Sequence, residues 1–311
     1  RHWNAARKHG LDILAKVQAN NTWELSTVPY VPVVANTAKH ALNLRAAGVD
    51  GLMLGWTLGG HPAPNLEVYA AVGRGSDTPL EDTARTRFGP KLAPLAVRAW
   101  RGYSDAMAEY PYHIGVLYKG PQQMGPANPL WPEPTGYAAT MVGFPYDNLK
   151  GWRAVFPPEV FAGQFRKVAD GFDATLRRLR QTAAEIEAPA ESKAALAEEC
   201  AIAEACAIHF RSVANQARFI LARDALAEAK DAETARPLLD RLAAVLEEET
   251  GLAKRMFALQ SADPRFGFEA SNHYFYVPYD LAAKVINCDY LRNTWLPAQR
   301  ARFDAGAATG G

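Results

Sequence analysis

The sequence LDILAKVQANNTWEL, residues 11–25, decides the predicted fold of the N-terminal part of the chain. Residues 11–18 alternate in part between apolar and polar side chains, as in a strand, and a polar and aromatic run follows them. A helix is predicted at residues 36–47, and a second strand at residues 51–56 leads into another polar loop, residues 57–62. Two strands joined by a helix form the βα pattern of a parallel sheet or barrel. Because the chemistry of such folds lies at the C-terminal ends of the strands, we expect functional residues in both loops.

The first loop supplies the candidate catalytic residue, Glu24. It follows Trp23 and lies close to Asn20 and Asn21. Carbohydrate sites use this mixture, because a carboxylate serves as acid, base or nucleophile, amides bridge hydroxyl groups, and a flat aromatic ring covers the apolar face of a sugar. The alternative is that Glu24 caps the loop or pairs with Lys16. The first loop is therefore a candidate carbohydrate site, with Glu24 catalytic and the other three residues binding substrate.

Further candidate substrate-binding residues lie outside this loop. Trp56 and His61 flank the end of the second strand, where Trp56 could equally fill the core. The segment EASNHYFY, residues 269–276, interrupts a helical region with polar residues between aromatics, and it contributes His273 and Tyr274. No histidine has a neighbour at metal-ligand spacing, so no metal site is predicted.

Composition excludes several classes of function. The chain has 311 residues, 49% hydrophobic and 22% charged, so it can bury a core. A formal net charge of +1 gives no field that would attract nucleic acid or an anionic membrane. No apolar run reaches the roughly 20 residues of a membrane span, and no glycine-rich phosphate loop follows a strand. The three cysteines have no ligand spacing and are expected to be buried thiols, so no cofactor is predicted.

The rest of the chain is predicted to be mainly helical. A helix that starts at Thr78-Pro79 should end near residues 88–90, and a longer amphipathic helix should cover residues 91–109. Residues 110–158, rich in proline, glycine and aromatics, are predicted to form an ordered loop. Long helices at residues 158–186, 191–228 and 232–261 have short connections, which favours an antiparallel three-helix bundle. A last helix is predicted from residue 279 to about residue 302.

Several phrases resemble a group of bacterial glycoside hydrolases. They are KVQANNTWELSTVPYVPV (residues 16–33), GVDGLMLGWTLGG (48–60), PAPNL (62–66), GPQQMGPAN (120–128) and EASNHYFY (269–276). Proteins of that group are (β/α)8 barrels with a helical C-terminal region, distantly similar to hexosaminidase-like and α-glucuronidase-like enzymes. The resemblance implies that the two βα units are the seventh and eighth of a barrel. It also implies that the missing N-terminal part of the barrel is a partner of this chain.

The predicted fold class is thus α/β plus α, with the last βα units of a (β/α)8 barrel followed by a mostly α-helical domain containing a three-helix bundle. The expected divisions are residues 1–72 for the barrel part, 73–157 for short helices and the aromatic loop, 158–303 for the helical domain, and 304–311 for a flexible tail. The expected function is hydrolysis of a glycosidic bond in an oligosaccharide or polysaccharide. The alternatives are a non-catalytic carbohydrate-binding protein or lapsed glycosidase, and a helical interaction module. Sugar enzymes of this kind are often exported, so a periplasmic or secreted location in a bacterium is one expectation.

A glycosidase also needs a second carboxylate. It would lie about 5–5.5 Å from Glu24 in a retaining enzyme or about 6.5–9.5 Å away in an inverting one. No sequence pattern identifies this second residue.

Overall fold

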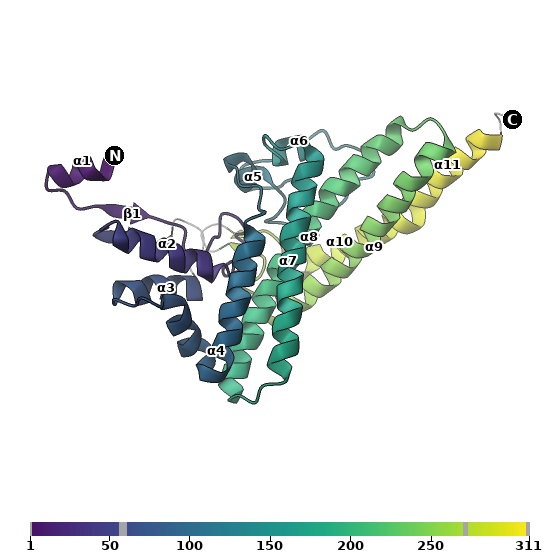
Figure 1. Ribbon diagram of the computed structural model, residues 1–311. Helices are drawn as coiled ribbons and strands as arrows, with labels where there is room; N and C mark the ends of the chain where they lie inside the picture. The colour runs from purple at the N-terminus through teal and green to yellow at the C-terminus, as the bar shows by residue number, and fades with distance from the viewer. Residues whose placement is uncertain (1, 56–60, 270–272, 309–311) are drawn as a thin grey trace. The chain divides into compact units, whose positions relative to one another are not determined.

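The computed structural model describes residues 2–55, 61–269 and 273–308. The chain is mostly helical (Figure 1). Its elements, in order, are α1 (His2–Lys8), β1 (Leu14–Lys16), α2 (Val34–Ala46), β2 (Gly51–Met53), α3 (Pro64–Gly73), α4 (Pro79–Met107), α5 (Ile114–Lys119), the 3₁₀ turn η1 (Gly125–Ala127), α6 (Leu149–Trp152), α7 (Pro158–Ala184), α8 (Ala190–Glu228), α9 (Ala232–Ala262), β3 (Phe268–Glu269), β4 (His273–Tyr274), α10 (Pro278–Tyr290), the π-helical turn η2 (Leu291–Trp295) and α11 (Leu296–Ala308).

The chain divides into two compact units. Unit 1 consists of Arg1–Ala108, Asp170–Cys206 and Phe268–His273, and unit 2 consists of Glu109–Ala169, Ala207–Gly267 and Tyr274–Gly311. Helices α7 and α8 therefore each contribute residues to both units. Neither unit is a continuous stretch of sequence.

The prediction of a (β/α)8 barrel is wrong. Strands β1 and β2 pair in parallel, with Leu14 opposite Gly51, and α2 connects them as predicted. However, each strand has three residues, and the described part of the chain contains two-stranded sheets only. A closed barrel needs a full ring of strands, whereas the residues described here fold mainly into helices. The local βα pattern was correct, but a barrel depends on further strands that a local pattern does not reveal.

The core of unit 1 is built by helices. Helices α2, α3 and α4 pack on one another (Figure 1). Helix α4 begins with Pro79 in its first turn and breaks at Gly89, whose φ of +70° is left-handed and favours glycine. The prediction of two helices that meet near residues 88–90 is therefore confirmed.

Helices α4 and α7 approach closely within unit 1. A Cβ atom on Gly102 would lie 2.6 Å from Thr175 Oγ1, and one on Gly171 would lie 2.5 Å from the Cβ of Ala106. Beside these contacts the rings of Tyr103 and Phe172 stack, with their centroids 4.9 Å apart. The two glycines thus allow a spacing that a larger residue would prevent.

The core of unit 2 joins the C-terminal half of α8 to α9, α10, η2 and α11. Its buried residues include Phe219 of α8, Leu242 of α9, Leu291 of η2 and Leu296 of α11. Helices α10 and α11 run beside α9 (Figure 1). The three long predicted helices exist, and the core that includes α8 and α9 also takes in the C-terminal helices. Helix α11 also continues to Ala308, where a flexible tail was predicted from residue 304.

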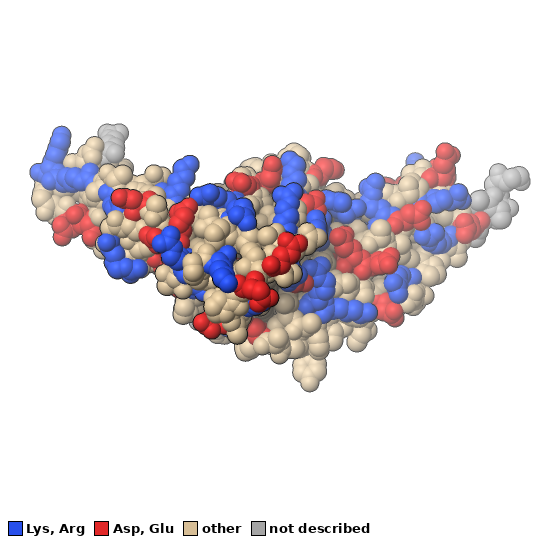
Figure 2. Space-filling view, turned by 60° about the horizontal axis from the view of Figure 1, so that its bottom comes forward, with Lys and Arg blue, Asp and Glu red and all other residues tan. Residues whose placement is uncertain are grey.

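The surface carries interspersed charges of both signs. Figure 2 shows lysine and arginine beside aspartate and glutamate over the visible face, in keeping with the net charge of +1. Among the described helices none has the length and apolarity to cross a bilayer.

Candidate functional site

The first predicted loop starts where strand β1 ends. Pairing continues beyond β1 and β2, because the Val17 N–H donates to the Met53 carbonyl at 2.9 Å and the Ala19 N–H donates to the Leu54 carbonyl at 3.0 Å. The following loop, residues 20–33, therefore leaves the carboxyl end of a parallel pair. The loop buries the polar side chains of Asn20, Thr22, Ser26 and Thr27. Asn20 Nδ2 donates within the loop, to the Pro29 carbonyl at 3.4 Å.

Two asparagines hold the loop in place. Asn20 Nδ2 donates to the His61 carbonyl at 2.9 Å, which joins the loop after β1 to the segment after β2. Asn65 Nδ2, at the start of α3, donates to the carbonyls of Ala19 at 2.8 Å and Val31 at 3.1 Å. The two predicted strand-end segments therefore come together, as parallel pairing requires. Since Asn20 is 2% exposed, its position suits a residue that fixes the two segments.

Glu24 is a partly buried carboxyl group in this loop. Burial raises its pKa, and hydrogen bonds from its own backbone and from the Asn21 side chain oppose that rise. Asn21 has a φ of +55°, a left-handed conformation that asparagine adopts more readily than most residues. Trp23, between them in sequence, is also partly buried. This local geometry gives a carboxyl group that keeps its proton to a higher pH than an exposed glutamate does.

Of the remaining predicted residues, the structure brings only the His61 backbone to this loop within its described part. His61 contributes its carbonyl to the Asn20 contact and is partly buried. Trp56 lies outside the described residues. His273 belongs to strand β4 in unit 1, and its side chain is likewise outside the described part. Tyr274 belongs to unit 2 and is 47% exposed.

A second carboxyl group in unit 1, Glu199 of α8, was missed by the sequence analysis. It accepts hydrogen bonds from the Tyr30 hydroxyl at 2.5 Å and from Trp100 Nε1 at 2.6 Å. Glu199 is 1% exposed, and burial raises its pKa against the effect of these two donors. Tyr30 is itself buried and belongs to the loop that carries Glu24. Glu199 therefore fixes the far end of that loop to helices α4 and α8.

The sequence contains a signal for Glu199. Ile202, Ala203 and Cys206 follow it at spacings of three, four and seven residues, and all three are fully buried. A carboxylate in line with the apolar face of a helix is expected to be buried and to need donors. The identity of those donors depends on tertiary contacts that span 99 and 169 residues of sequence.

Unit 2 contains a buried ion pair. Lys284 Nζ lies 2.8 Å from Glu249 Oε2, and both side chains have no exposed area. Glu249 also accepts hydrogen bonds from Ser212 Oγ at 2.8 Å and Asn215 Nδ2 at 3.2 Å. Lys284 also donates to the Asn128 carbonyl at 2.6 Å. These contacts tie α8, α9, α10 and the loop after η1 together, and the closed arrangement suits a structural role.

His209 forms a second buried contact in unit 2. Its Nδ1 lies 2.5 Å from the Gln122 carbonyl, and its Nε2 lies 2.7 Å from the Tyr276 hydroxyl. A carbonyl only accepts, so the neutral ring carries its proton on Nδ1 and accepts from Tyr276 on Nε2. Burial lowers the pKa of His209 to about 4. No group of histidine, cysteine, aspartate and glutamate side chains in the described part of the chain could hold a metal ion.

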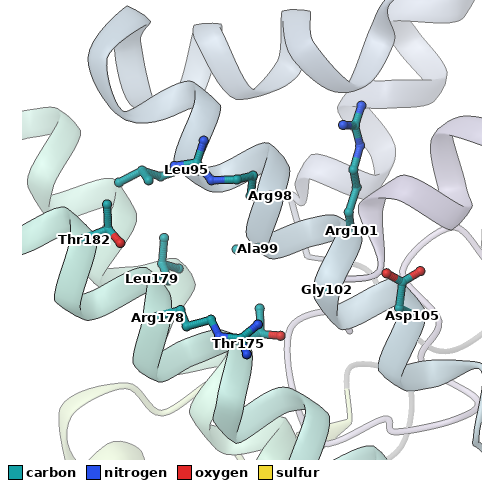
Figure 3. Close-up of a pocket in the computed structure, with 10 residues that line it drawn as sticks. All are labelled: Leu95, Arg98, Ala99, Arg101, Gly102, Asp105, Thr175, Arg178, Leu179 and Thr182. Atoms are coloured by element: carbon teal, nitrogen blue, oxygen red, sulfur yellow. The ribbon is translucent and has the colours of Figure 1, made fainter.

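A cleft of about 340 Å³ lies between α4 and α7 within unit 1 (Figure 3). Its polar lining residues include Arg98, Arg178 and Thr175, and Asp105 is its single carboxylate. Arg101 also lines the cleft, but its side chain is directed away from α7 in Figure 3. It donates at 2.8 Å to Glu81, which is not a lining residue. With one carboxylate, this cleft lacks the acid pair of a glycosidase.

Comparisons with protein-family models, with curated proteins and with solved structures find no match. The resemblance to glycoside hydrolases therefore rests on the quoted sequence phrases alone.

Proposed function

We propose that the loop at residues 20–33 is part of a carbohydrate site and that the chain takes part in hydrolysis of a glycosidic bond. One observation carries the proposal. Glu24 is a partly buried carboxyl group with a raised pKa, in a well-anchored loop at the carboxyl end of a parallel strand. This is the setting in which α/β folds place their reactive groups.

Glu24 would act as the proton donor. Cleavage of a glycosidic bond requires a proton on the departing oxygen, and burial lets Glu24 keep its proton to a higher pH than an exposed glutamate does. Asn21 would orient the carboxyl group through its side-chain hydrogen bond. Trp23 would cover one face of the sugar ring, and His61 would bind a hydroxyl group. Trp56, which was predicted to line the same site, lies outside the described residues. A second carboxylate would act as nucleophile or base.

A carbohydrate-binding protein without hydrolysis is the second candidate. It is favoured by the largest cause of the raised pKa of Glu24, which is burial. A close acid pair would raise the pKa of one member through repulsion between like charges. In this alternative Glu24 and Asn21 would bind sugar hydroxyl groups.

The two candidates are separated by the variant Glu24→Gln, which keeps the shape of the side chain and removes its proton chemistry. The exposed Glu187→Gln in the same unit is the matched control, since the Glu187 side chain is 95% exposed. Release of reducing sugar and calorimetric binding would be measured with xylo-, cello-, malto- and chito-oligosaccharides. The enzyme proposal is supported if the wild type and the control hydrolyse a substrate and Glu24→Gln lowers the rate of hydrolysis by at least about 100-fold.

Binding without product supports the second candidate, provided that Glu24→Gln weakens the binding and Glu187→Gln does not. If neither turnover nor binding depends on Glu24, the residue has no part in the function and the proposal falls.

A further inference from the structure

Unit 2 contains an ordered aromatic loop that is fixed to helix α8 by a buried ion pair. Asp147 Oδ2 lies 2.7 Å from Arg223 Nη1, and the two side chains are 7% and 5% exposed. Asp147 also accepts from the Thr135 hydroxyl at 2.5 Å, and Arg223 donates to the Trp131 carbonyl at 3.1 Å. Because one aspartate and one arginine tie together three points of the loop, its conformation is set before any ligand arrives.

Four aromatic rings pack within this loop. The ring of Phe144 has its centroid 4.8 Å from that of Tyr146 and 6.2 Å from that of Trp131, and the ring of Tyr137 lies 5.2 Å from that of Tyr146. Tyr137 nevertheless remains 66% exposed. An exposed ring supported from behind by other rings offers a rigid, flat, apolar surface that ends in a hydroxyl group.

The backbone around these rings is strained. Val142 and Tyr146 have φ values of +45° and +53°, in the left-handed region that L-residues other than glycine rarely adopt. A β-branched residue such as Val142 is especially unfavourable there. Such strain persists where surrounding contacts impose it, and it is concentrated at ligand-binding sites.

A pocket of about 420 Å³ lies against this loop, and its lining includes Tyr137, Asn148, Lys150, Arg153 and Asp224. These side chains offer both donors and acceptors. Arg223 contacts Asp224 through one oxygen, Oδ1, with Nε at 2.9 Å and Nη2 at 2.8 Å. The Asn148 carbonyl oxygen caps the Gly151 N–H, which leaves the amide nitrogen as a donor. The Lys150 ammonium group makes no ion pair or hydrogen bond within the described part of the chain.

The charges of the lining nearly cancel. Lys150, Arg153 and Arg223 carry three positive charges, and Asp147 and Asp224 carry two negative charges, so the difference is one positive charge. Asp147 and Arg223 already neutralise each other. A strongly anionic ligand would gain little here, whereas a neutral ligand with many hydroxyl groups could use the donors, the acceptors and the flat ring together.

We propose that this pocket binds a segment of an oligosaccharide, with the Tyr137 ring stacked on one sugar face and with Asp224 and Lys150 bound to its hydroxyl groups. The class of ligand rests on the proposed function, whereas the location rests on the contacts of the pocket alone. In this arrangement unit 2 would hold the chain of a polymeric substrate, independently of Glu24.

The test uses the full chain and compares Tyr137→Ala with Tyr112→Ala. Tyr112 is a matched control, because it lies in the same unit and is 68% exposed but does not line the pocket. Binding of xylohexaose, cellohexaose, maltohexaose and chitohexaose would be measured by calorimetry, and circular dichroism would confirm that both variants fold. We expect Tyr137→Ala to lose at least tenfold in affinity for the hexasaccharide that binds, and Tyr112→Ala to keep the wild-type affinity. A second variant, Asp224→Asn, should also weaken binding.

The same measurement in Glu24→Gln separates this inference from the proposed function. Binding that depends on Tyr137 and persists in Glu24→Gln supports the pocket even if no hydrolysis is found. Equal affinity of wild type and Tyr137→Ala overturns the pocket, and so does the absence of binding to all four hexasaccharides.

Discussion

Replacement of Lys284 by methionine is expected to destabilise the protein strongly, although methionine fills a similar volume without the charge. In the native structure the Lys284 ammonium group pairs with Glu249 at 2.8 Å and donates to the Asn128 carbonyl at 2.6 Å, with no exposed area on either charged side chain. The substitution leaves a buried carboxylate whose remaining donors, Ser212 and Asn215, are neutral.

The magnitude follows from desolvation. Removing one partner of a fully buried ion pair costs about 3–5 kcal/mol, because the other charge stays buried without compensation. The exposed pair of Arg300 and Asp240 has the same separation of 2.8 Å, with side chains 46% and 63% exposed. Exposed pairs contribute about 0–1 kcal/mol, so Arg300→Met should change stability little.

The assay is urea unfolding followed by circular dichroism, with Lys284→Met, Glu249→Gln, the double variant and Arg300→Met. The double variant should recover much of the lost stability, because no charge is then buried. If Lys284→Met costs less than about 1 kcal/mol, as expected for the exposed control, the ion pair is not desolvated and the reasoning is refuted.

Further predictions concern His209, two glycines and the thiols. The pKa of His209 falls from 6.5 to about 4 on folding, so the unfolded state binds more protons between these values, and stability should drop by roughly 3 kcal/mol as the pH falls through that window. Urea midpoints against pH should show this drop in the wild type but not in His209→Gln. Gly125→Ala should destabilise the protein by more than about 2 kcal/mol, because Gly125 has a φ of +50° and an added Cβ would clash with the His209 ring. Gly251 lies on α9 in open space, so Gly251→Ala should stabilise the protein by about 0.5–1 kcal/mol. Thermal melting of both variants shows whether each substitution lowers or raises the stability of the protein. Burial raises the pKa of all three cysteine thiols, so none should react with a thiol reagent at neutral pH until the protein unfolds, and reaction of the native protein would contradict the burial.

Much of the local structure could be predicted from sequence because its causes are local. The helix break at Gly89 follows from a glycine and a proline in adjacent positions. Helix α9 begins after Asp231, whose side chain accepts from the Thr234 N–H at 2.8 Å, a contact within three residues. The parallel pairing of β1 and β2 likewise follows from two short strands and the helix between them.

The sequence draws attention to the loop at residues 20–33, and the structure adds its contacts. Glu24 could be singled out because polar and aromatic residues follow a strand, and the structure adds the burial that raises its pKa. Parallel pairing explains why the segments that carry Asn20 and His61 meet, but it does not show that the Asn20 side chain bonds to the His61 carbonyl. Glu199 was not identified, since its donors Tyr30 and Trp100 are distant in sequence.

The sequence by itself thus determined the approximate positions of the long helices and of the first two strands, through capping residues, glycine and proline positions and apolar periodicity. Only the tertiary structure decided that β1 and β2 stand as a pair and not within a barrel, that the C-terminal helices complete the core around α8 and α9, and that Lys284 meets Glu249. The physical reason is that helical hydrogen bonds and caps join residues a few positions apart, whereas strand closure, core packing and buried ion pairs depend on which distant surfaces meet.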